Sequence, residues 1–311
     1  MKPTNPLLFV SLPTKAPVTP FTRRLFQLPP PPISASLSHN SLATFLSHAS
    51  RTSLPESTTT YQGTVYEYTI QSHLRKHAFA LHRVGGRSDL GIDLTGTWHV
   101  GANPILDPPI RVVVQCKALR TKLGPNIVRE LEGVTVRQSP SGTGAGGAGC
   151  AGVLVSPREA TRGVREALGR SGVPLVWMMV GWDGIVRQVL WNGGVERLGL
   201  GLVGLGVEVL YSPGEEREQD GQVDENGHKK GEARLTWEGE QVPTMAEIEE
   251  GMARLEGEWL AKWKGRGLED VSGDVILDAV ERVLPGTRPI MITEDEREEV
   301  ARSLLSAFSS A

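Results

Sequence analysis

Residues 86–93 read GRSDLGID, and residues 110–117 read IRVVVQCK. The first segment combines a Gly- and Asp-rich turn with the beginning of an alternating strand. The second is a continuous apolar run that ends in polar residues, as expected of a strand buried on both faces of a sheet. The two segments therefore predict neighbouring strands inside an α/β domain.

Helical and strand patterns follow one another on both sides of these segments. Tyr66, Ile70 and Leu74 share one stripe of a helix predicted over residues 62–77. Residues 156–159 have the S-x-x-E spacing of a capping box at the start of a later helix. The order helix, three strands, helix, strand, helix, strand predicts an α/β fold with a mixed sheet flanked by helices. The elements after the first helix are expected at 79–84, 91–99, 110–116, 125–136, 151–155, 157–170 and 174–180.

The rest of the chain has a different composition. Residues 1–60 are rich in Pro, Ser and Thr and contain no acid before Glu56, which is typical of a transit peptide. A plain disordered tail is the alternative. We expect a domain over 61–182 and a C-terminal extension over 183–311. The extension is expected to hold short strands, an acidic disordered segment at 213–232, and helices at 244–264 and 293–308.

Composition limits the class of protein. The 311 residues carry a net charge of −3 and two cysteines, Cys116 and Cys150, too few for a disulfide framework. No apolar run approaches the roughly 20 residues of a membrane span. We expect no membrane span, and the sequence leaves a homodimer open.

Three polar residues are predicted to meet at the edge of the sheet. Because side chains alternate along a strand, Gln115 and Lys117 share a face with Val113. Asp93 is expected on the polar face of the strand over 91–99, with Ile92 and Leu94 on the other face. One pairing of the two strands brings a carboxylate, an amide and an amine together. A structural ion pair between Asp93 and Lys117 is the alternative.

These residue types suit phosphodiester hydrolysis. The Asp93 carboxylate, the Gln115 amide oxygen and the Cys116 backbone carbonyl can bind Mg²⁺ or Mn²⁺. Lys117 can position a water molecule and offset negative charge that develops in the transition state. The sequence thus predicts a divalent-metal site that acts on nucleic acid.

The spacing of GRSDLGID and Val114-Gln115-Cys116-Lys117 resembles the Mrr-like restriction endonuclease group of the PD-(D/E)XK superfamily. In detail it is similar to a fungal mitochondrial family named for its requirement in respiratory growth. The resemblance covers about residues 61–180 and implies a restriction-endonuclease-like α-β-β-β-α-β core. It implies Asp93, Gln115 and Lys117 as the catalytic set, Glu67 as a fourth member and Asp89 as a weaker one.

The resemblance also implies a function and a location. The expected protein is a mitochondrial nuclease that cleaves DNA in preference to RNA. Gln115 stands where the superfamily has an acid, which leaves fewer negative ligands for the metal. A nucleic-acid-binding module without hydrolysis, or a structural factor for mitochondrial gene expression, therefore stays open.

Other patterns carry less weight. Residues 142–147 match G-x-G-x-x-G, but they follow a predicted helix and precede a strand, the reverse of a dinucleotide-binding turn. His73 and His77 have the spacing of helical zinc ligands but lack a third ligand, so packing or phosphate contact is expected. Basic residues near the predicted site can contact phosphates or form a solvated rim: Arg83, Arg87, Arg111, Arg120, Lys122 and Arg129.

Overall fold

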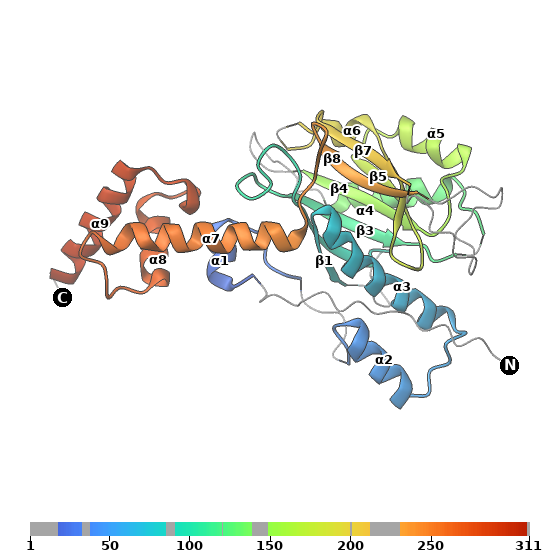
Figure 1. Cartoon of the computed structure of the whole chain (residues 1–311), viewed down its shortest axis with the longest axis horizontal. Helices are drawn as coiled ribbons and strands as arrows, with labels where there is room; N and C mark the ends of the chain where they lie inside the picture. The colour runs from blue at the N-terminus through green and yellow to red at the C-terminus, as the bar shows by residue number, and fades with distance from the viewer. Residues whose placement is uncertain are drawn as a thin grey trace. The chain divides into compact units, whose positions relative to one another are not determined.

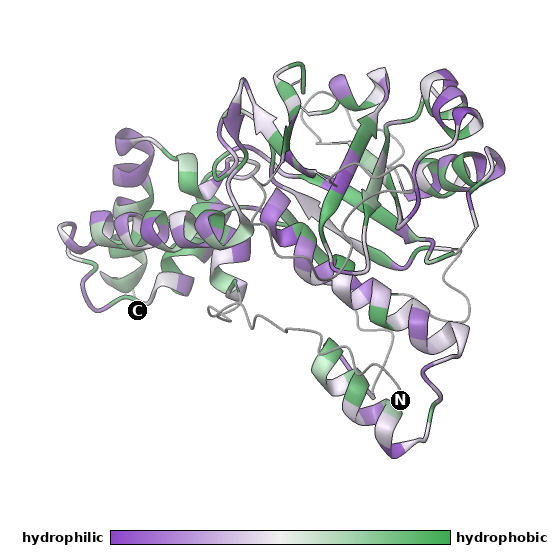
Figure 2. Ribbon diagram, turned by 45° about the vertical axis from the view of Figure 1, so that its right-hand side comes forward, coloured by the Kyte–Doolittle hydropathy of each residue, from purple (hydrophilic) through white to green (hydrophobic). Residues whose placement is uncertain are grey.

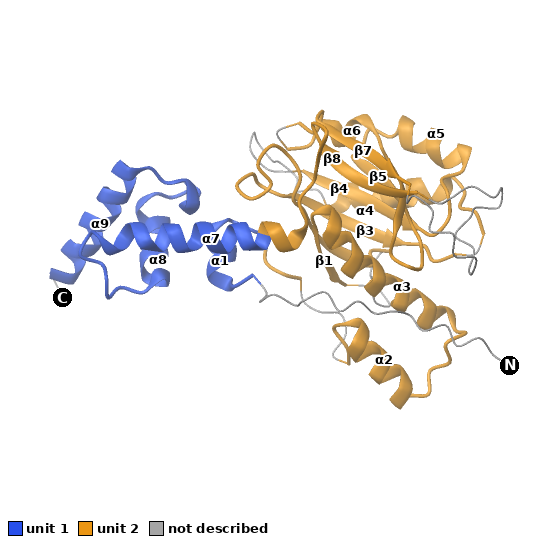
Figure 3. Ribbon diagram, viewed as in Figure 1, with its two compact units in different colours: residues 1–29, 249–311 blue, residues 30–248 orange. Residues whose placement is uncertain are grey.

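The computed structural model describes residues 18–32, 38–84, 91–119, 121–138, 149–199, 201–211 and 231–309. Several sequence-based expectations concern residues outside these ranges, including Asp89, the G-x-G-x-x-G motif and most of the acidic segment at 213–232. The chain divides into two compact units, residues 30–248 and residues 1–29 with 249–311 (Figure 3).

Residues 30–248 form an α/β unit built on a mixed sheet (Figure 1). The strands follow the order β1-β2-β3-β4-β5-β6, in which β3, β4 and β5 are parallel and the other neighbours antiparallel. Their bounds are β1 Phe79–Arg83, β2 Leu94–Trp98, β3 Ile110–Cys116, β4 Cys150–Ser156, β5 Leu175–Val180 and β6 Val186–Trp191. The predicted α/β class with a mixed sheet and flanking helices is confirmed.

The helices of this unit include the three predicted near 62–77, 125–136 and 157–170, together with two that were not predicted, at 42–51 and 193–196. They are α2 Leu42–Arg51, α3 Thr59–His73, η1 Leu74–His77, α4 Asn126–Gln138, α5 Arg162–Arg170 and α6 Gly193–Glu196. A smaller antiparallel sheet has the order β7-β8-β9, with bounds Leu205–Leu210, Glu232–Trp237 and Glu240–Gln241.

Apolar burial fixes which helix covers which face. Leu131 of α4 and Val164 of α5 pack against Leu154 and Trp177, on one face of the sheet. The stripe of α3 predicted to point inward, Tyr66, Ile70 and Leu74, is fully buried, and α3 lies against β1 and β3. In Figure 2 the strands carry mostly hydrophobic residues, whereas the helices mix both kinds, as expected of helices with one solvated face.

The register between β2 and β3 places the predicted site. Leu94 pairs with Val114 and Thr95 with Val113. Val113 packs with Ile92 and with Val134 of α4. Ile92 therefore lies on the α4 face, whereas Leu94 shares the other face with Val114. The prediction that Ile92 and Leu94 share a face was wrong, because regular alternation begins only at Leu94.

The other unit is helical. Its elements are α1 Pro20–Leu25, α7 Met245–Lys264, which enters the unit at Glu249, α8 Gly273–Val283, η2 Pro289–Met291 and α9 Glu294–Ser309. Trp259 and Trp263 of α7 are buried with Val280 of α8 and Val300 of α9. Within the described residues, no helix combines the length and apolar character that a bilayer crossing requires.

Two further local expectations differ from the structure. For residues 1–60 the sequence offered a transit peptide or a disordered tail, yet α1 and α2 lie there, and Phe45 of α2 packs on Tyr68 of α3. The capping box at 156–159 was wrong. Ser156 ends β4, and α5 begins after Thr161, whose side chain accepts the Val164 N–H as N-cap.

Candidate metal site at the β2–β3 junction

Asp93 lies where the pairing of β2 with β3 ends. Its carboxylate Oδ2 accepts a 2.6 Å hydrogen bond from the backbone N–H of Cys116. Its own N–H donates to the Val114 carbonyl at 3.0 Å, and its carbonyl accepts from the Val84 N–H at 2.9 Å. The side chain thus replaces a backbone acceptor at the end of the ladder. The Asp93 carboxylate thus contacts the main chain at Cys116, the residue between Gln115 and Lys117.

Gln115 is a buried amide beside this junction. The residue is 4% exposed, and its Oε1 has no hydrogen-bond partner among the described residues. A buried polar atom without a partner costs about 1–3 kcal/mol, so such atoms call for an explanation. A cation ligand role would supply the missing partner.

Gly91 makes room for the Gln115 amide. Gly91 has a φ of +82°, and a Cβ at that position would lie 2.9 Å from Gln115 Nε2. Two features of this position favour glycine: the left-handed backbone conformation and the close approach of the Gln115 side chain. The sequence placed Gly91 at the start of the strand expected over 91–99 and did not identify its contact with Gln115.

Cys116 can contribute its backbone carbonyl. The Lys117 N–H donates to the Val155 carbonyl of β4 at 2.8 Å. Because successive residues of a strand direct their N–H and C=O groups to opposite sides, those of Cys116 point toward β2, where Asp93 lies. Burial raises the pKa of the Cys116 thiol well above its usual value, with Asp93 and Glu67 acting in the same direction. The protonated sulfur leaves the carbonyl as the ligand atom that Cys116 offers.

Lys117 follows directly and is partly exposed. Its positive charge lowers the pKa of the Cys116 thiol, as does that of Arg83, so both cations lie near this sulfur. The site therefore has a buried side at Gln115 and a solvent-accessible side at Lys117.

Glu67 is joined to Arg83 rather than standing alone. Glu67 Oε2 accepts from Arg83 Nε at 2.5 Å, and the two side chains are 13% and 15% exposed. The Arg83 guanidinium also lies 5.7 Å from the centre of the Tyr68 ring. From the sequence, Arg83 was expected to contact phosphates or to lie in a solvated rim, and its pair with Glu67 was not predicted. The polar end of an otherwise apolar strand was the available signal.

The described residues contain no group of three or more His, Cys, Asp or Glu side chains able to hold a metal ion. A metal at this junction would depend on one carboxylate and two neutral oxygens. Such a ligand set fits Mg²⁺ or Mn²⁺, which take oxygen ligands and retain several waters. It predicts weak binding that bound substrate phosphates would strengthen.

The two histidines considered as zinc ligands have packing environments. Burial lowers the pKa of His77 to about 4, and burial also lowers the pKa of His73. The His77 carbonyl accepts from the indole N–H of Trp98 at 3.2 Å. These contacts agree with the predicted packing role.

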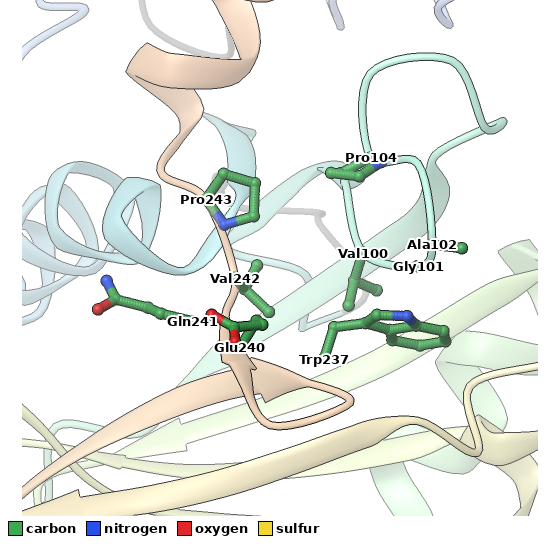
Figure 4. A pocket seen from close by; sticks show the side chains of 9 residues that line it. All are labelled: Val100, Gly101, Ala102, Pro104, Trp237, Glu240, Gln241, Val242 and Pro243. Carbon is green, nitrogen blue, oxygen red and sulfur yellow. The ribbon is translucent and has the colours of Figure 1, made fainter.

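Two cavities are lined by residues other than Asp93, Gln115 and Lys117. The first has a volume of about 160 Å³ and is formed by the loop after β2 and the β8–β9 hairpin (Figure 4). It is at the other end of β2, because Val100 follows that strand and Asp93 precedes it. The second has a volume of about 610 Å³. It is lined by Lys122, Glu159, Ala160, Thr161, Arg162 and Arg165.

The second cavity shares a sheet edge with Lys117. Strands β3 and β4 are parallel, so the chain leaves both strands at the same edge, after Cys116 and after Ser156. Thr161 Oγ1 donates to the Leu123 carbonyl at 3.0 Å, which joins the two loops that follow. Three cationic side chains and one acid line the cavity at this edge, where ligands of parallel sheets commonly bind.

Fold and site define an α/β protein with a six-stranded mixed sheet flanked by helices, whose β2–β3 junction carries an acid, an amide and an amine. The sequence profile of the family "Required for respiratory growth protein 7" matches residues 58–107 and 102–211, together about half of the chain. The α/β unit described above belongs to this family.

Individual relatives agree with this assignment. An uncharacterised mitochondrial protein of Schizosaccharomyces pombe (strain 972) is 35% identical over 160 residues, covering 50% of this chain and 61% of the relative. The mitochondrial Required for respiratory growth protein 7 of Saccharomyces cerevisiae (strain YJM789) is 27% identical over 161 residues, covering 39% and 65%. The matches thus span less than two thirds of either relative. No solved structure matches the chain.

The names of these relatives confirm the expected mitochondrial localisation. The family name states a requirement for respiratory growth, which is the coarse functional assignment that the match supports.

Proposed function

We propose that the α/β unit is a Mg²⁺- or Mn²⁺-dependent nuclease-like domain of restriction-endonuclease type that hydrolyses phosphodiester bonds in mitochondrial nucleic acid, DNA in preference to RNA. One observation carries the proposal. The Asp93 carboxylate accepts a hydrogen bond from the main chain at Cys116, the residue between Gln115 and Lys117. The buried Oε1 of Gln115 has no hydrogen-bond partner among the described residues.

The residues have distinct roles in this proposal. Asp93, the Gln115 Oε1 and the Cys116 carbonyl would hold the metal ion. A bound divalent ion supplies Lewis-acid polarisation of the phosphate and lowers the pKa of water. Lys117, on the exposed side, holds the attacking water by a hydrogen bond and offsets the charge that gathers on the phosphate oxygens.

The cationic cavity at the same sheet edge suits the phosphate backbone beside the cleaved bond. Lys122, Arg162 and Arg165 supply positive charge for contact with phosphates, which does not depend on base sequence. Arg162 is 93% exposed, and its ion pair with Glu166 is an i,i+4 surface pair. Exposed ion pairs of this kind contribute little to the free energy of folding, so a phosphate can take the place of the Glu166 carboxylate beside Arg162.

The test is cleavage of supercoiled plasmid by the purified full chain with Mg²⁺ or Mn²⁺. We expect nicking that disappears with EDTA and falls at least about 100-fold in Lys117→Ala, because the variant removes one group that stabilises the transition state. Lys76→Ala, which removes an exposed lysine of η1, is the matched control and should cut like the unmodified protein. Equal cleavage by Lys117→Ala would identify a contaminating nuclease and overturn the proposal.

A second candidate is a nucleic-acid-binding module on the same fold without hydrolysis. The Glu67–Arg83 ion pair favours it, because it ties up the predicted fourth catalytic carboxylate. Unchanged plasmid together with a gel shift for both the unmodified protein and Lys117→Ala would select this function.

A further inference from the structure

The N-terminal helix α1 is built into the helical unit, although it lies in the segment whose composition resembles a transit peptide. Leu25 and Phe26 are 0% and 1% exposed. The ring of Phe21 meets Trp259 edge to face, with centroids 5.9 Å apart. A Cβ on Gly273 of α8 would lie 3.1 Å from Phe21, so the two segments are in close contact. This is core packing of α1 against α7 and α8.

Polar contacts fix the same helix. Thr22 Oγ1 donates to Glu256 Oε2 of α7 at 2.6 Å, and both are partly buried. Arg24 bridges acids of α8, at 2.5 Å to Asp278 and 2.8 Å to Glu281. The hydrogen bonds to Glu281 and Asp278 raise the pKa of Arg24.

The carboxyl side of α1 is anchored as well. Gln27 Nε2 donates to the Thr287 carbonyl at 3.3 Å, and Arg288 Nη2 donates to the Phe26 carbonyl at 3.4 Å. Arg23 Nη1 donates to the Pro29 carbonyl at 2.8 Å, which folds the following residues back on the helix. Every turn of this segment thus has partners in α7, α8 or the loop after α8.

We infer that residues 19–29 are a permanent part of the folded protein, and that removal of a targeting segment ends before Thr19. A targeting segment is recognised while unfolded and is lost on cleavage, so its residues cannot also complete a core. The processing step is hydrolysis of one peptide bond. Water supplies the new carboxylate oxygen, and its protons pass to the new amino group and to solvent. Arg23 and Arg24, basic as in a transit peptide, act in the folded state instead.

The first test reads the N-terminus of the full chain after import into isolated mitochondria, by mass spectrometry of the intact protein. We expect an N-terminus at or before Thr19, the unprocessed chain included. A dominant N-terminus between residues 20 and 60 would overturn the inference.

The second test measures whether α1 stabilises the helical unit. Phe26→Ala and Phe308→Ala remove the same side chain from the same unit, but Phe26 is 1% exposed and Phe308 is 51% exposed. Hydrogen–deuterium exchange is read on peptides of α8 and η2 in the full-length protein. We expect Phe26→Ala to speed exchange at least about tenfold and Phe308→Ala to leave it unchanged, because exchange reports local stability. Equal exchange in the two variants would contradict a structural role for α1.

Discussion

The Asp93 carboxylate and the Cys116 backbone N–H are joined by a 2.6 Å hydrogen bond, so one side chain both ends the β2–β3 ladder and sits between Gln115 and Lys117. The structural and chemical roles of Asp93 therefore overlap. A variant that keeps the hydrogen-bond acceptor but removes the charge can separate them.

Asp93→Asn should leave the free energy of unfolding nearly unchanged, whereas Asp93→Ala should lower it. The Asn carbonyl can still accept the Cys116 N–H, so we expect a loss of less than about 1 kcal/mol. Alanine leaves the donor without its charged acceptor, which costs about 1.5–3 kcal/mol. Urea unfolding of the α/β unit measures both values. Equal losses in the two variants would show that the hydrogen bond does not stabilise the junction.

Gly91→Ala should damage the site more than an equivalent change elsewhere. The new Cβ would lie 2.9 Å from Gln115 Nε2, on a backbone with φ +82°. Gly239 has a φ of +89° with no neighbouring atom within 4 Å, so Gly239→Ala carries the backbone strain alone. Strain of this kind costs about 1–3 kcal/mol. In urea unfolding, we expect Gly91→Ala to lower the free energy of unfolding by at least about 1 kcal/mol more than Gly239→Ala does. An equal loss in the two variants would show that the close contact with Gln115 does not affect stability.

The cationic cavity predicts the salt dependence of DNA binding. Arg162→Ala with Arg165→Ala should lower the slope of log affinity against log salt concentration by roughly 2, about one for each phosphate that is no longer neutralised. Arg170→Ala is the matched control, since Arg170 lies on the same helix and also pairs with Glu166. Fluorescence anisotropy in EDTA measures binding without cleavage. An unchanged slope in the double variant would place the backbone contacts elsewhere.

Burial of His77 predicts a loss of stability in mild acid. Its pKa falls to about 4, mainly by desolvation, with Lys76 and Arg234 also lowering it and Glu232 opposing them. An unfolded histidine titrates near 6.5, so the unfolded state binds the proton first as the pH drops. Stability should be full above about pH 6.5 and should fall between about 6.5 and 4. The total loss is about 3 kcal/mol.

His77→Gln should flatten this pH dependence, because glutamine does not titrate. Denaturant unfolding at several pH values between 4 and 7 compares the two proteins. If the variant keeps the full slope, another group is responsible.

Much of the fold follows from the sequence because burial imposes simple periods. The strand at 110–116 was predicted with its observed bounds, since a segment rich in Ile and Val is typical of a strand buried in a sheet. The helical stripe of Tyr66, Ile70 and Leu74 was equally clear. The alternation along the strand predicted that Gln115 shares a face with Val113, and the structure shows that Val113 packs against Val134 of α4.

Features that depend on distant partners could not be read from local patterns. Helix α1 has too few residues to be stable alone, and its partners lie more than 200 residues away. The pairing of Glu67 with Arg83 joins a helix to a strand: the polar end of the strand indicated that Arg83 needs a partner, but no local pattern identified Glu67 as that partner. At 156–159 the capping-box spacing was present, but the chain first crosses the sheet edge and caps the helix at Thr161 instead.

Binding of Mn²⁺ to the purified full chain, followed by electron paramagnetic resonance, tests the central claim most directly. We expect one bound ion per α/β unit, with at least about tenfold weaker binding in both variants, because Asp93→Asn removes the carboxylate charge and Gln115→Leu removes one oxygen ligand. The Cys150→Ala variant, altered at a buried residue on the neighbouring strand, should bind as the unmodified protein does. Absence of binding, or equal affinity in the Asp93→Asn and unmodified proteins, would contradict a metal site at the β2–β3 junction.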